Sequence, residues 1–259
     1  MEILDYYVKS APSNQNALDI FKGEWTSSLP GSFSSLQVGQ LPLFEDPRIA
    51  WAVEQLGGVQ GKNVLELGPL EAGHTYMLEQ FGASSVTAIE SNTRAYLKCL
   101  IIKEVLGLKR SQFLCGDCVE YLRLAPRKFD ICIASGVLYH MVDPAELISL
   151  IAQVSNGIYL WTHYYDSEMF RLNPSLIQKF SGVKPADIGG FQHTLYRQEY
   201  KTALNYSGFC GGSNPFSHWM SRADILSCLR YFGFSDIKIN FEDPNNPNGY
   251  CFALVATKR

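Results

Sequence analysis

Short apolar runs alternate with stretches of helical periodicity between residues 62 and 164. Each run is short, largely apolar and bounded by glycine or polar residues, which is typical of a buried strand. The runs are NVLELG, SVTAIES, QFLCGD, FDICIAS and GIYLWTHYY. Residues 72–81 and 97–108 predict helices between the first three of them. Because strands that alternate with helices form parallel sheets with right-handed crossovers, this part of the chain predicts an α/β fold.

Capping residues mark further helix starts. Aspartate precedes proline at residues 46–47 and again at 143–144, and this pair favours a helix start because aspartate caps and proline suits the first helical position. Near the C-terminus, SRADILSCLRYFGF predicts a capped helix. SDIKINFED and CFALVATK then predict two strands, and the turn-rich PNNPNG between them suits an antiparallel hairpin.

Two regions fall outside this alternation. Residues 1–45 are rich in loop-forming residues, and residues 165–217 carry mixed aromatic and polar side chains. We therefore expect one domain over residues 46–259, with a cap insertion at 165–217 and an N-terminal lid segment at 1–45. The two outlying regions are expected to roof a pocket.

Composition narrows the class of protein. The 259 residues are 46% hydrophobic, and 22 basic against 25 acidic side chains give a net charge of −3, which argues against a broad nucleic-acid surface. The sequence shows no signal peptide and no run of about 20 apolar residues, so we expect a cytoplasmic protein outside the membrane. Its seven cysteines are expected to be reduced thiols. One C-x-x-C pair, Cys115 and Cys118, lacks the second pair that a zinc site would need, so we expect no metal.

The stretch VLELGPLEAGH, residues 64–74, resembles a nucleotide-binding loop with an unusual charge. Two carboxylates, Glu66 and Glu71, would repel a pyrophosphate, and Pro69 interrupts the G-x-G-x-x-G pattern. S-adenosylmethionine suits the loop better, because it carries a sulfonium and an ammonium and no phosphate. Gly68 and Gly73 would let the backbone approach this cofactor, and Glu66 would orient the loop and help to hold the ammonium end.

The following strand ends supply the rest of the expected cofactor site. Glu90 ends the second strand, 24 residues after Glu66, where a carboxylate accepts ribose hydroxyls. Asp117 ends the third strand and is expected to accept from the adenine amino group. The run SGVLYH ends the fourth strand and is expected to pass under the methionine moiety. The residues expected to contact the cofactor at these ends are Glu90, Ser91, Asp117, Cys118, Ser135, Gly136 and Tyr139.

These motifs resemble a known family. VLELGPLEAGH, AIES, CGD and FDICIASGVLYHM look like the signature of class I S-adenosylmethionine-dependent methyltransferases, over residues 46–164 and again over 221–259. The resemblance implies a Rossmann-like seven-stranded sheet in the order 3-2-1-4-5-7-6, with the last strand antiparallel and helices on both faces. GVLYH and YFGF are also similar to bacterial enzymes that carboxymethylate the wobble uridine of tRNA. In those enzymes basic residues precede the first strand, whereas here no Lys or Arg lies between Lys22 and Arg48.

Catalysis is expected to depend mainly on placing the acceptor in line with the methyl group. His140 and His163 follow the fourth and fifth strands, and each is either a base or orienting group or a partly buried histidine bonded to backbone. An aromatic roof would suit an organic acceptor, and Arg197 would pair a carboxylate of it. The alternative is that these side chains form the core of the cap. The residues expected to bind the acceptor are Trp25, His74, Tyr164, His193, Arg197, Tyr200 and His218.

The sequence therefore predicts an enzyme that transfers a methyl group from S-adenosylmethionine to a small organic acceptor by in-line displacement. One alternative is a methyl- or carboxymethyltransferase that modifies the wobble uridine of tRNA. A second is a non-catalytic protein that binds S-adenosylmethionine. Incorporation of a labelled methyl group into small molecules, into RNA or into neither would separate the three.

Overall fold

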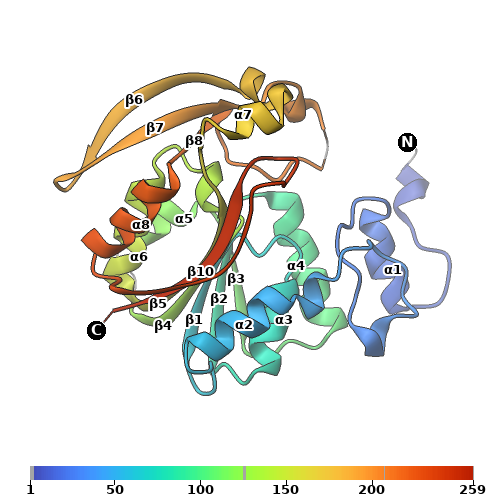
Figure 1. Cartoon of the computed structure of the whole chain (residues 1–259). Coiled ribbons are helices and arrows are strands. Elements are labelled where there is room, and N and C mark those ends of the chain that lie inside the picture. Colours follow the sequence, from blue (N-terminus) through green and yellow to red (C-terminus); the bar gives the residue numbers. More distant parts are fainter. Residues whose placement is uncertain (1–2, 125–126, 207, 259) are drawn as a thin grey trace.

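A seven-stranded sheet forms the centre of the protein, and its strand order is β3-β2-β1-β4-β5-β10-β9 (Figure 1). The computed structural model describes residues 3–124, 127–206 and 208–258. The strands are β1 (Asn63–Leu67), β2 (Ser85–Glu90), β3 (Ser111–Cys115), β4 (Phe129–Ser135), β5 (Ser155–His163), β9 (Asp236–Asp243) and β10 (Cys251–Thr257). The first five pair in parallel, and β10 is antiparallel to both of its neighbours. The predicted α/β, Rossmann-like sheet is confirmed.

Helices cover both faces of this sheet. They are α2 (Pro47–Gln55), α3 (Gly73–Gln80), α4 (Thr93–Val105), α5 (Cys118–Arg123), α6 (Pro144–Val154) and α8 (Arg222–Tyr231). Successive strand residues point to opposite faces, so Val64 packs with α2 and α3 while Leu65 packs with α6 and α8. The helix α4 packs on the first of these faces, against β2 and β3. The sheet is therefore buried on both sides.

The predicted capping residues lie where the sequence placed them. An Asp46 carboxylate oxygen accepts the Arg48 backbone N–H at 2.9 Å, and Asp143 caps α6 in the same way. The Ser221 hydroxyl oxygen caps α8. Each such cap stabilises its helix by about 1 kcal/mol. The predicted C-terminal hairpin is also present, as β9 and β10.

The cap insertion forms a second sheet, which the sequence analysis did not predict. Its strands are β6 (Phe180–Ile188), β7 (Phe191–Glu199) and β8 (Phe216–Trp219), paired antiparallel in the order β6-β7-β8. These three strands intervene in the chain, which is why the last two positions of the central sheet are held by β10 and β9. The insertion also contains α7 (Met169–Leu172) and the short 3-10 helices η6 (Pro174–Lys179) and η7 (Lys201–Asn205). In Figure 1 the cap sheet forms a separate layer above the central one.

The N-terminal segment is a chain of short helices packed beside α4 (Figure 1). Leu18 and Phe44 are buried in one cluster with Cys99 and Ile102 of α4. The helices are η1 (Ile3–Tyr6), α1 (Asn14–Leu18), η2 (Asp19–Phe21), η3 (Gly31–Phe33) and η4 (Leu43–Glu45). Within the described ranges, no helix combines the length and the apolar character needed to cross a bilayer.

Candidate active site

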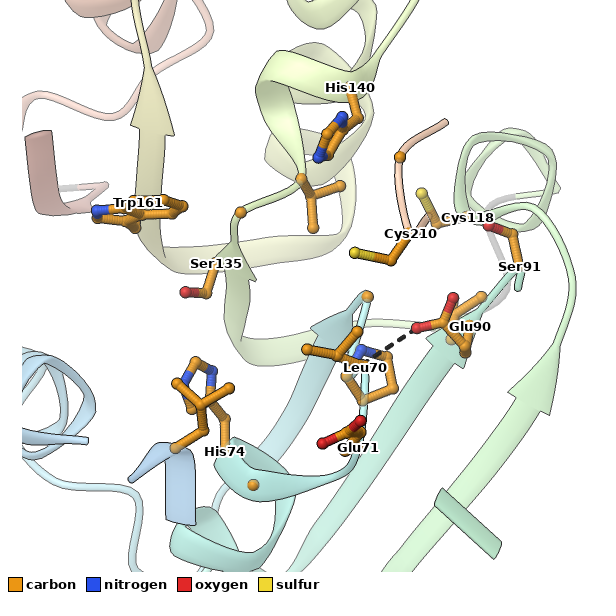
Figure 2. Close-up of a pocket in the computed structure, with 18 of the residues that line it drawn as sticks. Leu70, Glu71, His74, Glu90, Ser91, Cys118, Ser135, His140, Trp161 and Cys210 are labelled. Atoms are coloured by element: carbon orange, nitrogen blue, oxygen red, sulfur yellow. Dashed lines mark hydrogen bonds between the residues drawn. The ribbon is translucent and has the colours of Figure 1, made fainter. Parts of the chain in front are cut away.

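A cavity of about 300 Å³ opens at the carboxyl ends of β1, β2 and β4 (Figure 2). This edge of a parallel sheet is where such folds bind their ligands. Many of the predicted site residues line it. From the cofactor set these are Gly68, Pro69, Gly73, Glu90, Ser91, Cys118, Ser135, Gly136 and Tyr139. From the acceptor and catalytic sets these are His74 and His140.

Glu90 lies at the end of β2 with its carboxylate in the cavity lining. One oxygen accepts the Leu70 N–H at 3.1 Å, which is the contact drawn in Figure 2, and the other accepts the Asn92 N–H at 2.8 Å. Burial raises the pKa of Glu90, and the hydrogen bonds from the backbone oppose that rise. Because a carboxylate offers about four acceptor positions, each oxygen keeps capacity for a further donor from the cavity.

The loop after β1 is bent into a shape that only some residues tolerate. Gly68 adopts a left-handed φ of +64°, and a Cβ on it would lie 3.0 Å from Cγ2 of Val137. Leu70 and Ala72 also adopt positive φ, which costs about 1–2 kcal/mol for each residue with a side chain. A Cβ on Gly73 would lie 2.7 Å from the carbonyl oxygen of Leu43. The loop therefore presents backbone to the cavity and lets the N-terminal segment approach closely.

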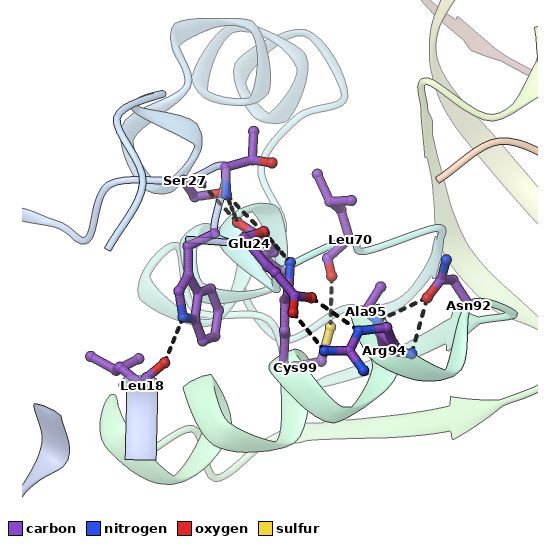
Figure 3. A network of polar contacts seen from close by, with 12 residues as sticks. Leu18, Glu24, Ser27, Leu70, Asn92, Arg94, Ala95 and Cys99 are labelled. Atoms are coloured by element: carbon purple, nitrogen blue, oxygen red, sulfur yellow. Dashed lines mark hydrogen bonds and ion pairs between the residues drawn. The ribbon is translucent and has the colours of Figure 1, made fainter. Parts of the chain in front are cut away.

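Glu71, one of the two carboxylates of this loop, contacts the N-terminal segment. Figure 3 shows the surrounding polar network, in which Glu24 and Ser27 of the N-terminal segment lie beside Leu70 of the loop and Cys99 of α4. The buried carboxylate of Glu71 accepts the Ser27 N–H at 2.8 Å, the Thr26 N–H at 3.0 Å and the Lys98 ammonium at 2.9 Å. Lys98 also donates to the carbonyl oxygen of Glu24. Glu71 is thus paired by Lys98, and it fastens the N-terminal segment to the loop.

Two other predicted carboxylates lie outside the cavity lining. Glu66 is buried and accepts a hydrogen bond from the hydroxyl of Thr75 in α3, which orients the start of that helix, and its predicted part in holding the ammonium end stays a prediction. Burial raises the pKa of Glu66. Asp117 is exposed, and its Oδ1 accepts the N–H groups of Val119 and Glu120 as the N-cap of α5. Its Oδ2 accepts none of these capping hydrogen bonds, and the predicted contact of Asp117 with adenine stays a prediction.

A polar triad at the other end of the cavity was not predicted. Arg48 donates through Nε and Nη2 to the buried carboxylate of Asp46, and its guanidinium lies 5.1 Å from the ring centre of Trp161. His74 Nε2 lies 3.0 Å from Asp46 Oδ2. Burial alone would raise the pKa of Asp46, but the hydrogen bonds from His74 and Arg48 outweigh it and lower that pKa. Arg48, His74 and Trp161 all line the cavity.

The acceptor end is formed by aromatic groups and by His140. Tyr139 has its ring centre 4.1 Å from that of His140 and 5.9 Å from that of Trp161. His140 Nδ1 lies 2.8 Å from the hydroxyl of Tyr200, which is buried behind it in the cap. Burial lowers the pKa of His140 to about 4, with a smaller contribution from nearby His163. His140 is therefore neutral at pH 7.

His163 was expected to act on the acceptor, but it lies behind the cavity wall. Its Nδ1 contacts the carbonyl oxygens of Gly249 and Tyr250, so it donates to backbone. The ring packs edge-on against Tyr139 and stacks on Trp219. This arrangement matches the alternative stated for His163, namely a partly buried histidine bonded to backbone.

Arg197 and Trp25 also lie outside the lining. The Arg197 guanidinium packs on the ring of Phe216 and pairs with Glu199 at 2.6 Å, so its charge is used on the cap surface. The Trp25 indole N–H donates to the carbonyl oxygen of Leu18 at 2.8 Å, within the N-terminal segment. The partner of Arg197 in the ion pair is only two residues away in the chain, whereas Phe216 comes from the neighbouring strand β8.

The remaining acceptor candidates belong to the core of the cap or of the hairpin. His193 and His218 are buried, and their Nδ1 atoms contact the carbonyl oxygens of Phe191 and Val142. Tyr164 is buried against aromatic rings at the start of β10. Tyr200 does not line the cavity either, but it reaches it through His140. For these residues the alternative of a cap core is what the packing shows.

Several lining residues were missed because distant segments bring them to the site. Residues 210–212 of the cap cross the cavity beside Cys118 and Glu90, as Figure 2 shows for Cys210. Thr26, Ser27, Leu41 and Leu43 close it from the N-terminal segment. The only sequence signal for the last group was the glycine at position 73, which leaves room for the Leu43 backbone.

Comparison with known proteins agrees with this geometry. Residues 65–159 match the family model described as a methyltransferase domain. This match identifies a methyltransferase domain within the chain. No curated protein sequence matches it significantly.

Solved structures resemble this chain in fold. The N-terminal domain of EvdMO1, crystallised in the presence of SAH and D-fucose, is 23% identical, with 95% of each chain covered and a TM-score of 0.72. The chain spans 47% of the full length of EvdMO1. Magnesium protoporphyrin IX methyltransferase from Synechocystis PCC 6803 is 18% identical, with 83% and 81% covered and a TM-score of 0.53. The 1,6-didemethyltoxoflavin-N1-methyltransferase of Burkholderia thailandensis is 15% identical, with 84% and 78% covered and a TM-score of 0.52.

S-adenosylmethionine is the cofactor expected for such a domain, and SAH, the product that remains after it gives up its methyl group, is present in the similar structures. The residues of the cavity suit such a ligand. Glu90 offers acceptors at one end, Arg48 offers donors at the other, and Gly68 leaves the backbone uncovered between them.

Proposed function

We propose that the enzyme transfers the methyl group to a small organic acceptor by in-line displacement. The observation that carries this proposal is the distribution of polar groups in this cavity, whose lining includes the Glu90 carboxylate, the Arg48 guanidinium and the His140 imidazole. S-adenosylmethionine supplies an electrophilic methyl group when it is bound. The residues of the chain would hold, orient and enclose it.

The cofactor would lie along the carboxyl ends of the strands. Glu90 would accept the ribose hydroxyls, because the N–H groups of Leu70 and Asn92 leave acceptor positions on its two oxygens. Gly116 and Cys118 line the cavity beyond it and would border the adenine. Ser135 and Gly136 would contact the methionine moiety from β4.

Arg48 would hold the carboxylate of the methionine moiety. Its Nε and Nη2 are bonded to Asp46, which fixes the guanidinium, and the side chain still lines the cavity. His74 shares the same aspartate and lies beside it. A planar guanidinium held in this way suits a carboxylate. The methyl group would then point toward Tyr139 and His140.

The acceptor would be small, because two chain segments roof the cavity. Thr26, Ser27, Leu41 and Leu43 cover it from residues 1–45, which we propose as a lid, and residues 210–212 cover it from the cap at 165–217. The similar proteins named above are described with D-fucose and with 1,6-didemethyltoxoflavin, which are small molecules. The net charge of −3 gives no support for binding tRNA.

A cytoplasmic location would fit the cysteine chemistry. All seven cysteines are free thiols, and four of them are buried: Cys99, Cys132, Cys228 and Cys251. Free thiols are the usual state in a reducing compartment.

Transfer of a labelled methyl group into a fractionated metabolite extract tests the proposed function. The expected result is label in the small-molecule fraction that depends on active enzyme. Label in the RNA fraction would instead support the tRNA alternative. Binding of the cofactor with label in no fraction would support a non-catalytic protein.

A further inference from the structure

The wall of the cavity between β4 and β5 carries two groups whose hydrogen-bonding roles can be assigned. His140 lines the cavity, and Figure 2 shows its ring pointing into it. Tyr139 lines it as well, with its hydroxyl oxygen 3.7 Å from the position of a Cβ on Gly136. Trp161 continues the wall toward Arg48.

Tyr200 decides which nitrogen of His140 carries the hydrogen. The Gly212 N–H donates to the Tyr200 oxygen at 3.4 Å, and His140 Nδ1 lies 2.8 Å from the same oxygen. The Ser217 hydroxyl, which donates to Gln198 Oε1, is a second neighbour of this phenol. A neutral imidazole nitrogen is a stronger acceptor than a serine oxygen, so the Tyr200 hydroxyl is assigned as the donor to Nδ1. The hydrogen of the ring is then on Nε2, because a neutral imidazole carries only one.

His140 therefore faces the cavity with a donor and not with a basic nitrogen. Burial keeps its pKa at about 4, so it stays neutral at pH 7. Burial also raises the pKa of Tyr139, so its hydroxyl stays protonated and is a second donor. This part of the wall consequently offers N–H and O–H groups to the acceptor.

The other titratable groups in the lining are engaged elsewhere. Glu71 is bonded to Lys98 and to backbone N–H groups. Glu90 is proposed for the ribose, and His74 shares Asp46 with Arg48 at the methionine end. Burial raises the pKa values of the Cys118 and Cys210 thiols, so these groups are protonated at pH 7. None of these groups supplies a base at the wall formed by Tyr139 and His140.

We propose that the acceptor presents a carboxylate to this wall, that His140 holds one of its oxygens through Nε2–H, and that Tyr200 is the positioning residue that keeps the hydrogen there. The inference rests on the proposed methyl transfer and names its acceptor group. A carboxylate matches the wall because it accepts hydrogen bonds only and is already ionised at pH 7.

The chemistry balances without a base. One carboxylate oxygen forms a bond to the methyl carbon while the bond from that carbon to sulfur breaks. The electron pair of the broken bond stays on sulfur, and the products are a methyl ester and S-adenosylhomocysteine. No proton moves. The step joins an anion with a cationic sulfonium to give two neutral centres, which a cavity shielded from water favours.

Nitrogen NMR tests the tautomer without any acceptor. Long-range ¹H–¹⁵N spectra of the five histidines report which ring nitrogen is protonated, and His140→Gln identifies the signals of His140. We expect Nε2–H in the wild type and a mixture of tautomers in Tyr200→Phe. Tyr196→Phe is the matched control, because it removes a hydroxyl from the same cap where the ring stacks on Tyr165. A wild-type His140 with its hydrogen on Nδ1 would overturn the role of Tyr200.

Alkali tests the acceptor group. Methyl esters release labelled methanol in mild alkali, whereas methyl ethers and N-methyl groups are stable. We expect the enzyme-dependent label in the small-molecule fraction to become volatile. Label that resists alkali would overturn the carboxylate assignment even though methyl transfer had occurred. If no label entered small molecules, the proposed function would fail and the carboxylate assignment with it, while the NMR result would still judge Tyr200.

Two substitutions separate a donor from a base at position 140. Glutamine retains an N–H donor and cannot act as a base, whereas alanine retains neither. We expect His140→Ala to lower kcat/KM by roughly tenfold or more, the usual effect of losing a hydrogen bond to a charged group, and His140→Gln to restore a large part of it. Equal loss in both variants would identify His140 as a base and contradict the proposal.

Discussion

The two halves of the cavity are built in different ways. The proposed cofactor half is formed by the loops at the ends of β1, β2 and β4, together with Arg48 from the start of α2. The acceptor half joins His140, Trp161, Tyr200 and Gly212, which are spread over more than 70 residues of the chain. The fold itself therefore positions the donor, whereas an insertion completes the acceptor site. This division explains how one sheet architecture can serve many acceptors.

The halves also differ in their chemistry. The cofactor half presents carboxylate oxygens from Glu90 and bare backbone at Gly68. The acceptor half presents neutral donors and aromatic faces. Substitutions in the first should change the affinity for the cofactor, and substitutions in the second should change the transfer rate. The N-terminal segment is joined to the first half through Glu71.

Loss of the Glu71 carboxylate should have the largest effect. Glu71→Ala leaves the buried Lys98 ammonium without its partner and two backbone N–H groups without an acceptor. Breaking a buried pair from one side costs about 3–5 kcal/mol, and urea unfolding would measure it. The control is Glu120→Ala, which removes an exposed pair with Arg123 and should cost less than about 1 kcal/mol. Equal losses would mean that Glu71 does not fasten the segment.

Removing the Glu90 carboxylate should weaken the cofactor half alone. Glu90→Ala should lower the affinity for S-adenosylhomocysteine roughly tenfold or more, since hydrogen bonds to a charged group are worth about 1.5–3 kcal/mol. Calorimetric titration measures the change. Asp117→Ala is the matched control, because this strand-end carboxylate caps α5 outside the cavity. An affinity that fell in Asp117→Ala and not in Glu90→Ala would reverse the assignment.

Alanine substitutions at two glycines with the same backbone conformation would distinguish backbone strain from an effect on cofactor binding. Gly68 and Gly107 have φ values of +64° and +66°, so an alanine at either should cost about 1–2 kcal/mol of stability. Only at Gly68 does the new Cβ meet a neighbour, Val137, in the cavity wall. Titration with S-adenosylhomocysteine should therefore show weaker binding for Gly68→Ala and unchanged binding for Gly107→Ala. Equal affinities in the two variants would contradict the proposed close approach of the cofactor to Gly68.

The burial of His140 should make the free energy of unfolding depend on pH. Burial lowers the pKa of His140 from 6.5 to about 4, so between these values the unfolded chain binds the proton more readily. The free energy of unfolding should rise with pH across this window and stop gaining from His140 above it. Urea unfolding of wild type and His140→Gln at several pH values should show a smaller rise in the variant. Identical slopes would mean that His140 is not buried as described.

More of the predicted cofactor residues than of the predicted acceptor residues line the cavity, and this difference has a physical reason. Glu90 and the glycines of the loop after β1 follow directly from strand ends, which apolar periodicity locates. Asp117 has the same sequence signature as Glu90, and only the three-dimensional structure shows that one caps a helix and the other lines the cavity. A strand-end carboxylate alone does not distinguish these uses.

Most of the missed features depend on contacts between distant residues. The role of Glu71 depends on Thr26 and Ser27, more than 40 residues earlier in the chain. Asp46 was recognised as a helix cap, but its second role with Arg48 and His74 has no local signal. The histidines of the cap were overvalued because aromatic clusters in a core and in a binding site have the same composition.

The separation of the two halves is tested most directly on His140→Ala. Its affinity for S-adenosylhomocysteine would be measured by calorimetry and its methyl transfer into the metabolite extract by labelling, both on one preparation. The account predicts an affinity equal to that of the wild type, with transfer reduced about tenfold or more. A parallel loss of affinity and transfer would contradict it, because His140 would then belong to the cofactor half.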